Sequence, residues 1–297
     1  MVLFITNYMP ELPEVEVVKR SLINKLQNLI VKAVKINDGK LRYKIDRRKI
    51  KKIIGLKFKK ISRRSKYLLF YFNKDFVMLV HLGMTGKFFF IDHKRAKYKT
   101  SFYYDINEDK DKKHDHIIFR LSNNQKLIYN DIRKFGFIKF LNQADLTKNT
   151  HLKYLGPEPL SREFNIEYFK NYIEGKQRVV KTILMDQKFI SGLGNIYVNE
   201  ILFFSGIRPT KEIKKLTDLE IQKIIKFSKK IISKAIIFGG SSIKDFSSSS
   251  GKKGSFQQYF SVYGKKDENC SKAKCKGKIK KIVIANRASF FCNICQK

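Results

Sequence analysis

Residues 9–16 have the sequence Met-Pro-Glu-Leu-Pro-Glu-Val-Glu, which gathers two prolines and three glutamates in an otherwise basic chain. Proline is favoured in the first turn of a helix, and glutamate is favoured there because it faces the positive end of the helix dipole. Composition alone therefore predicts a helix N-terminus. A helix over residues 15–30 follows, because apolar residues recur at steps of three and four from Val15 to Leu29.

Beyond this helix the chain changes to short apolar runs rich in β-branched and aromatic side chains, which are typical of strands. The runs cover residues 67–72, 76–81, 87–91, 117–121 and 136–141. Polar turns such as Asn73–Asp75 and Ser122–Asn124 separate them. We therefore predict an N-terminal β-sandwich or flattened barrel.

A Gly-Pro-Glu-Pro segment, Gly156–Pro159, ends the strand pattern, because proline can continue neither a ladder nor a helix there. The helical period then returns in residues 166–173, 179–185, 196–204 and 219–238. The serine- and glycine-rich stretch Ser247–Gly254 cannot bury enough surface to order itself, so we expect a mobile loop. The predicted fold is α+β and multidomain: a leader (residues 1–9), a β-sandwich domain with its amphipathic helix (10–150), a helical domain (151–260) and a cysteine module (261–297).

Charge points to a polyanionic partner. The chain has 297 residues, with 63 Lys and Arg against 26 Asp and Glu and a net charge of +37. Such an excess attracts nucleic acid, although a lysine-rich composition can also reflect genome bias. No run approaches the ~18 apolar residues that a membrane span needs, and the N-terminus lacks the features of a signal peptide. We expect a monomeric, cytoplasmic, nucleoid-associated protein without a membrane partner.

The four cysteines are clustered near the C-terminus. Cys270 and Cys275 enclose four residues, Cys292 and Cys295 enclose two, and sixteen residues separate the pairs. A disulfide framework would spread its cysteines through a small secreted chain, whereas this spacing fits a four-thiolate zinc ribbon. Free thiols or redox use are the alternatives. We predict one structural Zn²⁺ ion, because four protein ligands leave no open position for catalysis.

The opening segment and six later motifs together resemble the formamidopyrimidine-DNA glycosylases, and the resemblance extends from Met9 to Lys297. The later motifs are RSKYLL (64–69), HLGMTG (81–86), KHDH (113–116), LGPEPL (155–160), GLGNIY (192–197) and NRASF (286–290). Their order and spacing carry the resemblance. It implies an N-terminal β-sandwich, a helix-two turns-helix domain with a zinc finger, and double-stranded DNA bound between them. It also implies removal of 8-oxoguanine and formamidopyrimidines, followed by β,δ-elimination at the abasic site.

The resemblance implies a role for five catalytic residues. Pro10 matches the N-terminal proline whose amine attacks the sugar C1′; a secondary amine gives an iminium ion that carries its charge without protonation. Glu11 matches the general acid or proton shuttle, and Glu14 a supporting carboxylate. Lys66 matches a phosphate contact assigned to β-elimination, and Arg287 a phosphate ligand linked to δ-elimination. Outside the family, the two glutamates could be helix-start acids and Lys66 a solvated lysine.

The sequence departs from the family at its start, because Met1–Tyr8 precede Met9. A leader of this kind would make the Pro10 nitrogen an inert tertiary amide. We expect translation to begin at Met9 and removal of that methionine to expose Pro10. Intact mass of the native protein tests this expectation.

Further matches concern DNA binding. Asn195 matches a phosphate ligand at a helix start, where backbone N–H groups favour an anion. His114 and Lys176 match other DNA contacts; without the family they are a surface histidine and a solvated lysine. The residues that match those filling the gap left by the flipped nucleotide are Met84, Arg133 and Phe135. The alternative for Met84 and Phe135 is the core of a sheet.

Three further departures accompany these matches. Ile132 stands where the family usually has Pro, and Lys134 where it usually has Arg. The first cysteine pair has a longer spacing than the usual two residues. The segment Gly239–Phe256 matches the lid over the damaged base, and its serine-rich tip leaves the lesion preference open.

Three alternative functions remain. The related endonuclease VIII branch acts on oxidised pyrimidines, but Leu12 and the long lid favour the purine branch. A DNA-damage binder without catalysis becomes serious only if the leader persists. A zinc-ribbon adaptor would not need the acidic, proline-led start.

Overall fold

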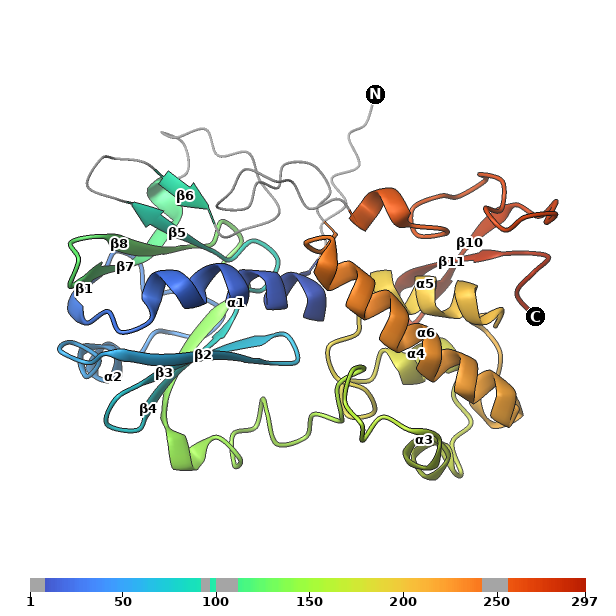
Figure 1. The fold of residues 1–297 in the computed structure, drawn as a ribbon, viewed down its shortest axis with the longest axis horizontal. Coiled ribbons are helices and arrows are strands. Elements are labelled where there is room, and N and C mark those ends of the chain that lie inside the picture. Colours follow the sequence, from blue (N-terminus) through green and yellow to red (C-terminus); the bar gives the residue numbers. More distant parts are fainter. Residues whose placement is uncertain (1–8, 92–96, 100–111, 242–255) are drawn as a thin grey trace. The chain divides into compact units, whose positions relative to one another are not determined.

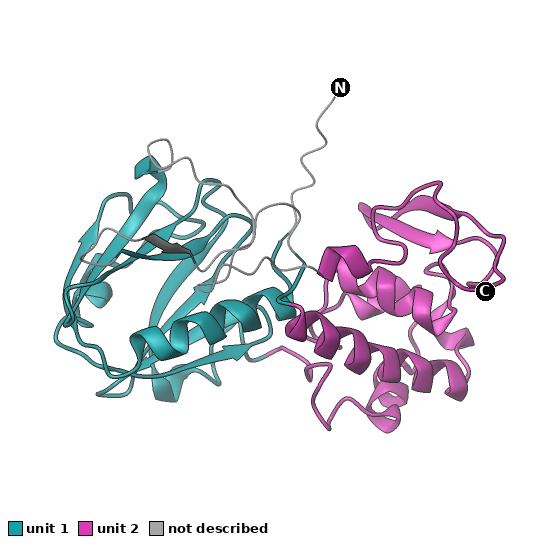
Figure 2. Cartoon of the chain, turned by 45° about the horizontal axis from the view of Figure 1, so that its top comes forward, with its two compact units in different colours: residues 1–153, 239–255 teal, residues 154–238, 256–297 magenta. Residues whose placement is uncertain are grey.

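The computed structural model describes residues 9–91, 97–99, 112–241 and 256–297. The chain divides into two compact units (Figure 2): unit 1 contains residues 1–153 and 239–255, and unit 2 contains residues 154–238 and 256–297. Most of the leader, the serine-rich loop and most of the segment expected to cover the lesion lie outside the described residues.

Unit 1 begins with α1 (Leu12–Leu26), which starts where the opening segment predicts a helix N-terminus. Pro13 lies in its first turn, and the backbone of Glu11 is extended at the N-cap. The predicted continuation of the helix to residue 30 is wrong. Asn28 adopts a left-handed φ of 66°, which ends the helix and turns the chain toward β1.

Two antiparallel sheets make up the rest of unit 1 (Figure 1). One has the order β1-β7-β8-β5-β6 and the other β2-β3-β4-β9. The bounds are β1 (Val31–Ile36), β2 (Phe58–Arg64), β3 (Tyr67–Phe72), β4 (Phe76–His81), β5 (Lys87–Ile91), β6 (Lys97–Lys99), β7 (Asp115–Leu121), β8 (Lys126–Asn130) and β9 (Phe137–Asn142). The short helices are α2 (Arg47–Lys51), η1 (Lys112–His114) and η2 (Gln143–Asp145).

A single apolar core joins the helix and both sheets. Leu22 of α1, Phe70 of the four-stranded sheet, and Phe88 and Phe119 of the five-stranded sheet all belong to it, and each is fully buried. This arrangement confirms the predicted β-sandwich with an amphipathic helix. The strand pattern missed β1, β2, β6 and β8. In β2, lysines and arginines interrupt the apolar residues, and the burial of Phe58 and Ile61 reveals its inner face.

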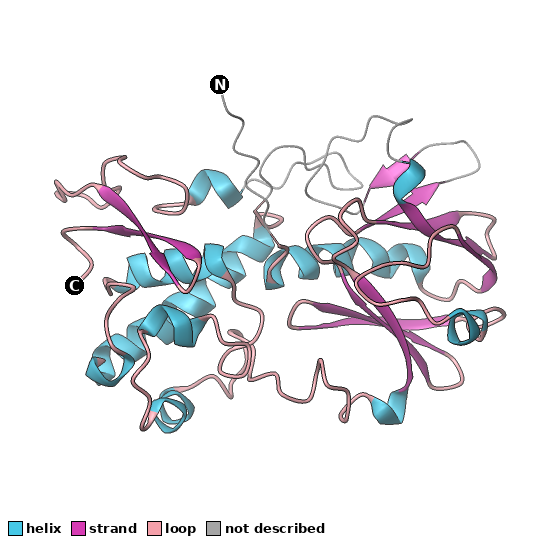
Figure 3. Cartoon of the chain, turned by 180° about the vertical axis from the view of Figure 1, so that it is seen from behind, coloured by secondary structure: helices cyan, strands magenta, loops and turns pink. Residues whose placement is uncertain are grey.

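Unit 2 is helical with a small two-stranded sheet, as Figure 3 shows. Its elements are α3 (Ile166–Ile173), α4 (Val180–Leu184), α5 (Asn195–Ser205), η3 (Ile213–Lys215), α6 (Asp218–Ile237), η4 (Phe256–Tyr259), β10 (Ile279–Ile284) and β11 (Arg287–Cys292). All four predicted helices are confirmed to within two residues at each end. In the described part of the chain, no helix has the length and apolar character that crossing a bilayer requires.

Local signals explain two of these helix ends. Thr217 and Glu220 form a capping box at the start of α6, where each side chain accepts the backbone N–H of the other. Gly206 ends α5 with a φ of 75°, a conformation that glycine adopts without strain. Nearly the whole circumference of α5 is buried, so this helix forms the centre of unit 2.

Candidate catalytic and nucleic-acid-binding sites

The start of α1 is a buried, tightly bonded segment. Pro10 is buried, and Glu11 and Glu14 are 4% and 1% exposed. One carboxylate oxygen of Glu14 accepts the backbone N–H of Glu11 at 2.9 Å. Its other oxygen accepts the N–H of Ser241 at 2.8 Å and the hydroxyl of Ser241 at 2.9 Å. Glu14 therefore holds the Pro10-Glu11 segment in place and ties it to residues far along the chain.

The segment that follows α6 approaches Glu14 very closely. Gly240 has a φ of 79°, and a Cβ atom there would lie 3.0 Å from the Glu14 carboxylate. Only glycine combines this backbone conformation with this close approach. Gly240 thus allows Ser241 to reach the Glu14 carboxylate, at the described end of the segment that matches the family's lid.

Lys66 lies in the tight turn between β2 and β3. Ser65, which precedes it, has a left-handed φ of 55° and is 1% exposed. The Arg63 guanidinium fixes this turn, because it donates to the Ser65 carbonyl at 2.9 Å and to the Glu16 carboxylate of α1 at 2.9 Å. Lys66 is consequently held at a set distance from the helix that begins at the Pro10 segment.

Glu16 is a buried anion that stays ionised. Burial by itself raises its pKa, but hydrogen bonds from Lys19, Arg63 and Arg20 hold the pKa below its usual value. The three ion pairs measure 2.7 Å, 2.9 Å and 3.0 Å, respectively. The sequence analysis missed Glu16 and Arg63. Glu16 is the last residue of the opening motif and Arg63 directly precedes RSKYLL, and these positions are their only sequence signal.

His81, at the end of β4, is a neutral histidine near Lys66. Burial, together with the positive charges of Lys66, Arg42 and His151, lowers its pKa to about 3. Its Nδ1 atom accepts the N–H of Gly83 at 3.1 Å. An imidazole that stays uncharged adds no repulsion toward Lys66, and it shapes the turn that leads to Met84.

Two loops of unit 1 bring Met84, Arg133 and Phe135 together with His114. Met84 is half-buried in the β4–β5 loop, and Phe135 is 45% exposed in the β8–β9 loop. The Arg133 guanidinium lies 4.5 Å from the centroid of the Phe135 ring. The carbonyl of His114 accepts the N–H of Asp131 at 3.1 Å, which ties His114 to the base of the same loop. The sheet-core alternative for Phe135 therefore does not hold.

In unit 2, Asn195 is hydrogen-bonded to the residue that follows Arg287. Asn195, the first residue of α5, donates to the Ala288 carbonyl at 3.0 Å. Arg287 is exposed at the start of β11, after a two-residue turn in which Ala285 and Asn286 have φ values of 46° and 57°. Two positive φ angles are typical of the type I′ hairpin turn. The first residue of α5 therefore holds the backbone one residue beyond Arg287.

A buried polar network supports this hairpin, and the sequence analysis missed it. Lys181 is 0% exposed, and its ammonium group donates to the Ala288 carbonyl at 2.9 Å and to the Ser289 hydroxyl at 2.6 Å. Asn199 accepts the N–H of Phe290 at 2.7 Å. Glu200 accepts the N–H groups of residues 261–263 at 2.8–3.0 Å. Asn199 and Glu200 are polar residues inside a mostly apolar helical run, which is the signal that could have found them.

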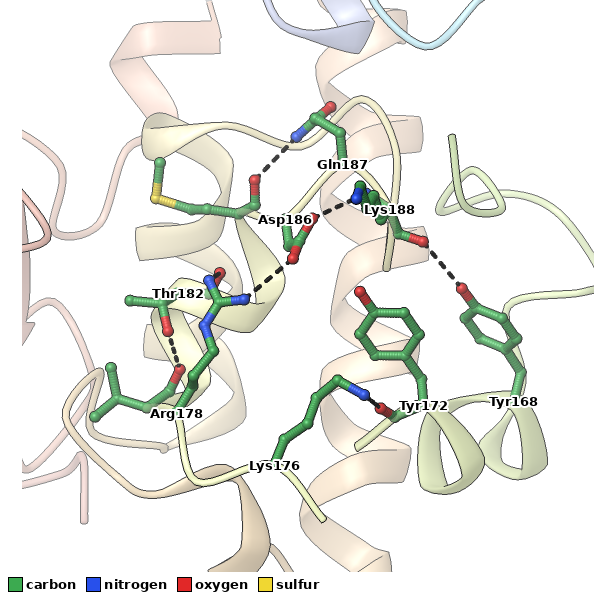
Figure 4. Close-up of polar contacts among 10 residues, drawn as sticks. Tyr168, Tyr172, Lys176, Arg178, Thr182, Asp186, Gln187 and Lys188 are labelled. Carbon is green, nitrogen blue, oxygen red and sulfur yellow. Dashed lines mark hydrogen bonds and ion pairs between the residues drawn. The ribbon is translucent and has the colours of Figure 1, made fainter. Parts of the chain in front are cut away.

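Lys176 belongs to a separate cluster in unit 2 (Figure 4). Its ammonium group donates to the carbonyl of Tyr172 in the last turn of α3 and lies 4.2 Å from the centroid of the Tyr172 ring. Nearby, Tyr168 donates to the Phe189 carbonyl at 2.7 Å. Burial and the proximity of Tyr172 raise the pKa of Tyr168 to about 12. Lys176 thus caps α3, and its charge lies at the C-terminal end of that helix.

The four cysteines meet at one point. Their sulfur atoms all lie within 4.8 Å of one another, with Cys270 to Cys295 at 3.7 Å and Cys275 to Cys292 at 3.6 Å. These separations are too long for disulfides, which need ~2.05 Å. They match the ~3.8 Å edge of a tetrahedron with ~2.3 Å metal–sulfur bonds. The four thiols can therefore bind one metal ion.

The surroundings of the cysteines also suit a metal. A Cβ atom on Gly277 would lie 2.6 Å from the sulfur of Cys292, so this position needs glycine. Burial raises the pKa of the Cys292 thiol, but the backbone N–H groups of Cys295 and Ile294 hold it at about 7. Metal ligation requires the thiolate, which these amides favour.

Comparisons with known proteins identify the family. Residues 9–138 match the model of the formamidopyrimidine-DNA glycosylase N-terminal domain, and residues 155–247 match that of the formamidopyrimidine-DNA glycosylase H2TH domain. The chain belongs to the formamidopyrimidine-DNA glycosylase family. The enzymes of this family are bifunctional DNA glycosylases and AP lyases of base-excision repair. The resemblance drawn from the motifs is thereby confirmed.

Relatives support this membership along nearly the whole chain. The formamidopyrimidine-DNA glycosylase of Rickettsia massiliae is 40% identical over 288 residues, which cover 97% of each chain. A crystal structure of a Lactococcus lactis Fpg variant with Fapy-dG-containing DNA superposes with a TM-score of 0.84 at 33% identity, covering 97% of this chain and 100% of that one.

Two further structures of the Lactococcus lactis enzyme superpose with a TM-score of 0.82. One holds DNA with an abasic site, at 33% identity and with 97% of this chain and 99% of that chain covered. The other holds DNA with an oxidised pyrimidine, at 32% identity and with 97% and 100% covered.

Proposed function

We propose that this protein removes oxidised purines from duplex DNA through an imine formed by Pro10, and then cuts the abasic strand. The observation that carries the proposal is the buried start of α1, where the Glu14 carboxylate fixes the Glu11 amide at 2.9 Å. A nucleophile must be held near its attack position, and this bond fixes the backbone next to Pro10. The described structural neighbours with Fapy-dG and abasic DNA support the same substrate class.

The covalent step requires a free Pro10 nitrogen. This secondary amine attacks C1′, the C1′–N9 bond breaks, and the departing base takes a proton. The proline nitrogen loses its proton, the C1′–O4′ bond opens, and the ring oxygen takes a proton and stays on C4′ as a hydroxyl. The resulting iminium ion at C1′ is the electron sink for the eliminations. Removal of a C2′ proton expels the 3′ phosphate, and a second elimination expels the 5′ phosphate. We propose that the active enzyme begins at Pro10, and the N-terminal family match that starts at residue 9 supports this.

Other residues handle protons and charge. Glu11 is the proposed proton shuttle at the sugar, and Glu14 the carboxylate that orients it. Lys66 is the proposed phosphate contact and participant in β-elimination. The neutral state of His81 supports this assignment, because burial and nearby cations lower its pKa to about 3 and it does not compete with Lys66 for the phosphate.

DNA contacts are proposed in both units. Asn195 and Arg287 bind phosphates around the lesion, and Arg287 assists δ-elimination. The hydrogen bond from Asn195 to the carbonyl of Ala288, the residue that follows Arg287, supports this assignment. His114 and Lys176 contact the DNA backbone. Met84, Arg133 and Phe135 fill the space left by the extruded nucleotide, which offsets part of the lost stacking energy. The exposure of Phe135 supports this last assignment, because a core residue could not enter DNA.

One Zn²⁺ ion is proposed at Cys270, Cys275, Cys292 and Cys295. Its role is structural, because all four ligands come from the protein. The sulfur separations of 3.6 Å and 3.7 Å support a tetrahedral ion. The longer spacing of the first pair is compatible with this geometry, since the sulfurs converge despite it.

Borohydride trapping tests the proposal. Two forms of the protein are compared, one that begins at Pro10 and one that retains Met1–Tyr8, each with a duplex containing 8-oxoguanine. We expect a covalent adduct only with the Pro10 form, and a much slower adduct after Pro10→Gly. Equal trapping by both forms would refute the imine assignment. Parallel duplexes with Fapy-dG and with an oxidised pyrimidine test the lesion class, and faster excision of the pyrimidine would overturn the purine assignment.

A further inference from the structure

The two loops that carry the proposed wedge residues are in direct backbone contact. Met84 lies in the β4–β5 loop, while Arg133 and Phe135 lie in the β8–β9 loop. A Cβ atom on Gly83 would lie only 2.4 Å from the carbonyl carbon of Phe135 and the nitrogen of Gly136. The loops therefore touch without any intervening side chain at this point.

A chain of buried hydrogen bonds also joins the two loops. The backbone N–H of Arg133 donates to the Thr85 hydroxyl at 2.9 Å, and this hydroxyl donates to one oxygen of the Asp131 carboxyl group. The other Asp131 oxygen accepts the N–H of Gly136 at 2.8 Å. Thr85 and Asp131 are 3% and 0% exposed. Thr85 is thus the single residue of the first loop that bonds both the carboxyl group and the backbone of the second.

The β7–β8 part of the sheet fixes Asp131 in turn. Its N–H donates to the carbonyl of His114 at 3.1 Å, and its own carbonyl lies 2.8 Å from Nε2 of His116. The hydroxyl of Tyr129 lies 3.5 Å from its carboxyl group. Hydrogen bonds of this kind are strong in a buried site and costly to leave unmade. The carboxyl group is therefore a fixed point to which the Thr85 hydroxyl is bonded.

We propose that Thr85 and Asp131 are positioning residues that lock the two loops into one preformed wedge, so that Met84, Arg133 and Phe135 enter the duplex together. The inference rests on the proposed function of those three residues. A preformed wedge does not have to be ordered at the moment of binding, which lowers the cost of opening the duplex. The pair touches neither base nor sugar, and its effect is confined to steps that require extrusion of the nucleotide.

The hydroxyl of Thr85 can be removed with little change of shape. Thr85→Val keeps the volume and leaves the Arg133 N–H and the Asp131 carboxyl group without this partner. Thr85→Ser keeps the hydroxyl and is the matched control. Both are prepared in zinc-loaded protein beginning at Pro10, with thermal unfolding recorded for each, and Thr85→Ala takes the place of Thr85→Val if the latter does not fold.

Two substrates separate wedge function from chemistry. Excision of 8-oxoguanine from a duplex under single turnover requires extrusion, whereas cleavage of an abasic site in a single strand does not. For Thr85→Val we expect duplex excision to slow by about ten- to hundredfold, the loss typical of misplaced groups. Single-strand cleavage stays within about twofold, and Thr85→Ser restores duplex excision. The fluorescence of 2-aminopurine beside the lesion rises correspondingly more slowly in Thr85→Val.

A double-mutant cycle with Phe135→Ala decides the mechanism. If Thr85 acts through the wedge, Thr85→Val has little further effect once Phe135 is removed. Additive losses, or equal slowing on both substrates, would show a general structural role and overturn the inference. If Thr85→Val excises 8-oxoguanine at the wild-type rate while Phe135→Ala excises it slowly, the role of Thr85 is overturned but the proposed wedge is not. Wild-type excision by both Met84→Ala and Phe135→Ala would instead overturn the proposed wedge itself.

Discussion

Replacing Glu14 by glutamine tests whether the start of α1 is held by a carboxylate that only accepts hydrogen bonds. Three donors converge on Glu14, namely the Glu11 N–H at 2.9 Å, the Ser241 N–H at 2.8 Å and the Ser241 hydroxyl at 2.9 Å. Glutamine has one oxygen and one NH2 group. Whichever way it is oriented, its NH2 group must face a backbone N–H that also donates.

The cost follows from the number of bonds lost. Hydrogen bonds to a charged group contribute ~1.5–3 kcal/mol, and a buried donor left unsatisfied costs ~1–3 kcal/mol. Glu14 is 1% exposed, so water cannot replace the lost partner. We expect Glu14→Gln to lower the free energy of unfolding by about 2–4 kcal/mol. We also expect slower imine formation, by about ten- to hundredfold, because the backbone beside Pro10 is less well positioned.

Denaturant unfolding and the rate of borohydride trapping measure the two effects. Asp145→Asn is the matched control, because it removes an exposed carboxylate of the same unit, and it should leave both quantities unchanged. Wild-type stability together with wild-type trapping in Glu14→Gln would refute the reasoning. A loss of stability with an unchanged trapping rate would limit Glu14 to a structural role.

Three further predictions concern other parts of the molecule. Lys181→Met removes the two charged hydrogen bonds to β11, at 2.9 Å and 2.6 Å. It should destabilise the protein by about 2–4 kcal/mol and lower the ratio of δ- to β-elimination product on abasic DNA. Lys223→Met, which changes an exposed lysine of the same unit, is the control and should alter neither quantity. Burial and the nearby cations lower the pKa of His81 from 6.5 to about 3. As pH falls from about 6.5 toward 3, this group should therefore remove about 1.4 kcal/mol of stability per pH unit. Unfolding measured against pH should show that His81→Asn lacks this contribution. Chelation or Cys270→Ser should remove zinc, measured by metal analysis, and abolish duplex binding; retained binding by metal-free protein would contradict a structural metal.

The helices of unit 2 were predictable because their apolar residues recur at helical spacing or, in α5, form a nearly continuous apolar run, and because local signals mark two of their ends. The α6 helix begins at its capping box and α5 ends at Gly206, both visible in the sequence. Strands were less predictable. In β2 the inner face consists of only a few apolar residues among cations, so burial against α1 decides its structure, and burial is a tertiary property.

The candidate site shows the same division. Residues within motifs, such as Pro10, Lys66 and Arg287, could be named from the sequence because the resemblance carries each position. The groups that hold these residues in place could not be named from the sequence. Arg63 bonds to Glu16 across 47 residues and Lys181 bonds to Ser289 across 108, and no local pattern reports such pairs. The cysteine cluster was predictable because its spacing is itself the signal, and the sulfurs converge as that spacing requires.

The wedge loop shows how the protein tolerates a departure from its family. A proline at a compatible loop position restricts the unfolded chain and contributes about 0.4–1 kcal/mol, a contribution that Ile132 does not make. Three buried hydrogen bonds through Thr85 and Asp131 hold the same loop, each contributing roughly 0.5–1.5 kcal/mol. Lys134 adds an ion pair with Asp38 at 2.7 Å while adopting a left-handed φ of 58°. Together these hydrogen bonds contribute more free energy than the conformational-entropy contribution of a proline. The order of this loop therefore depends on buried polar groups rather than on a proline.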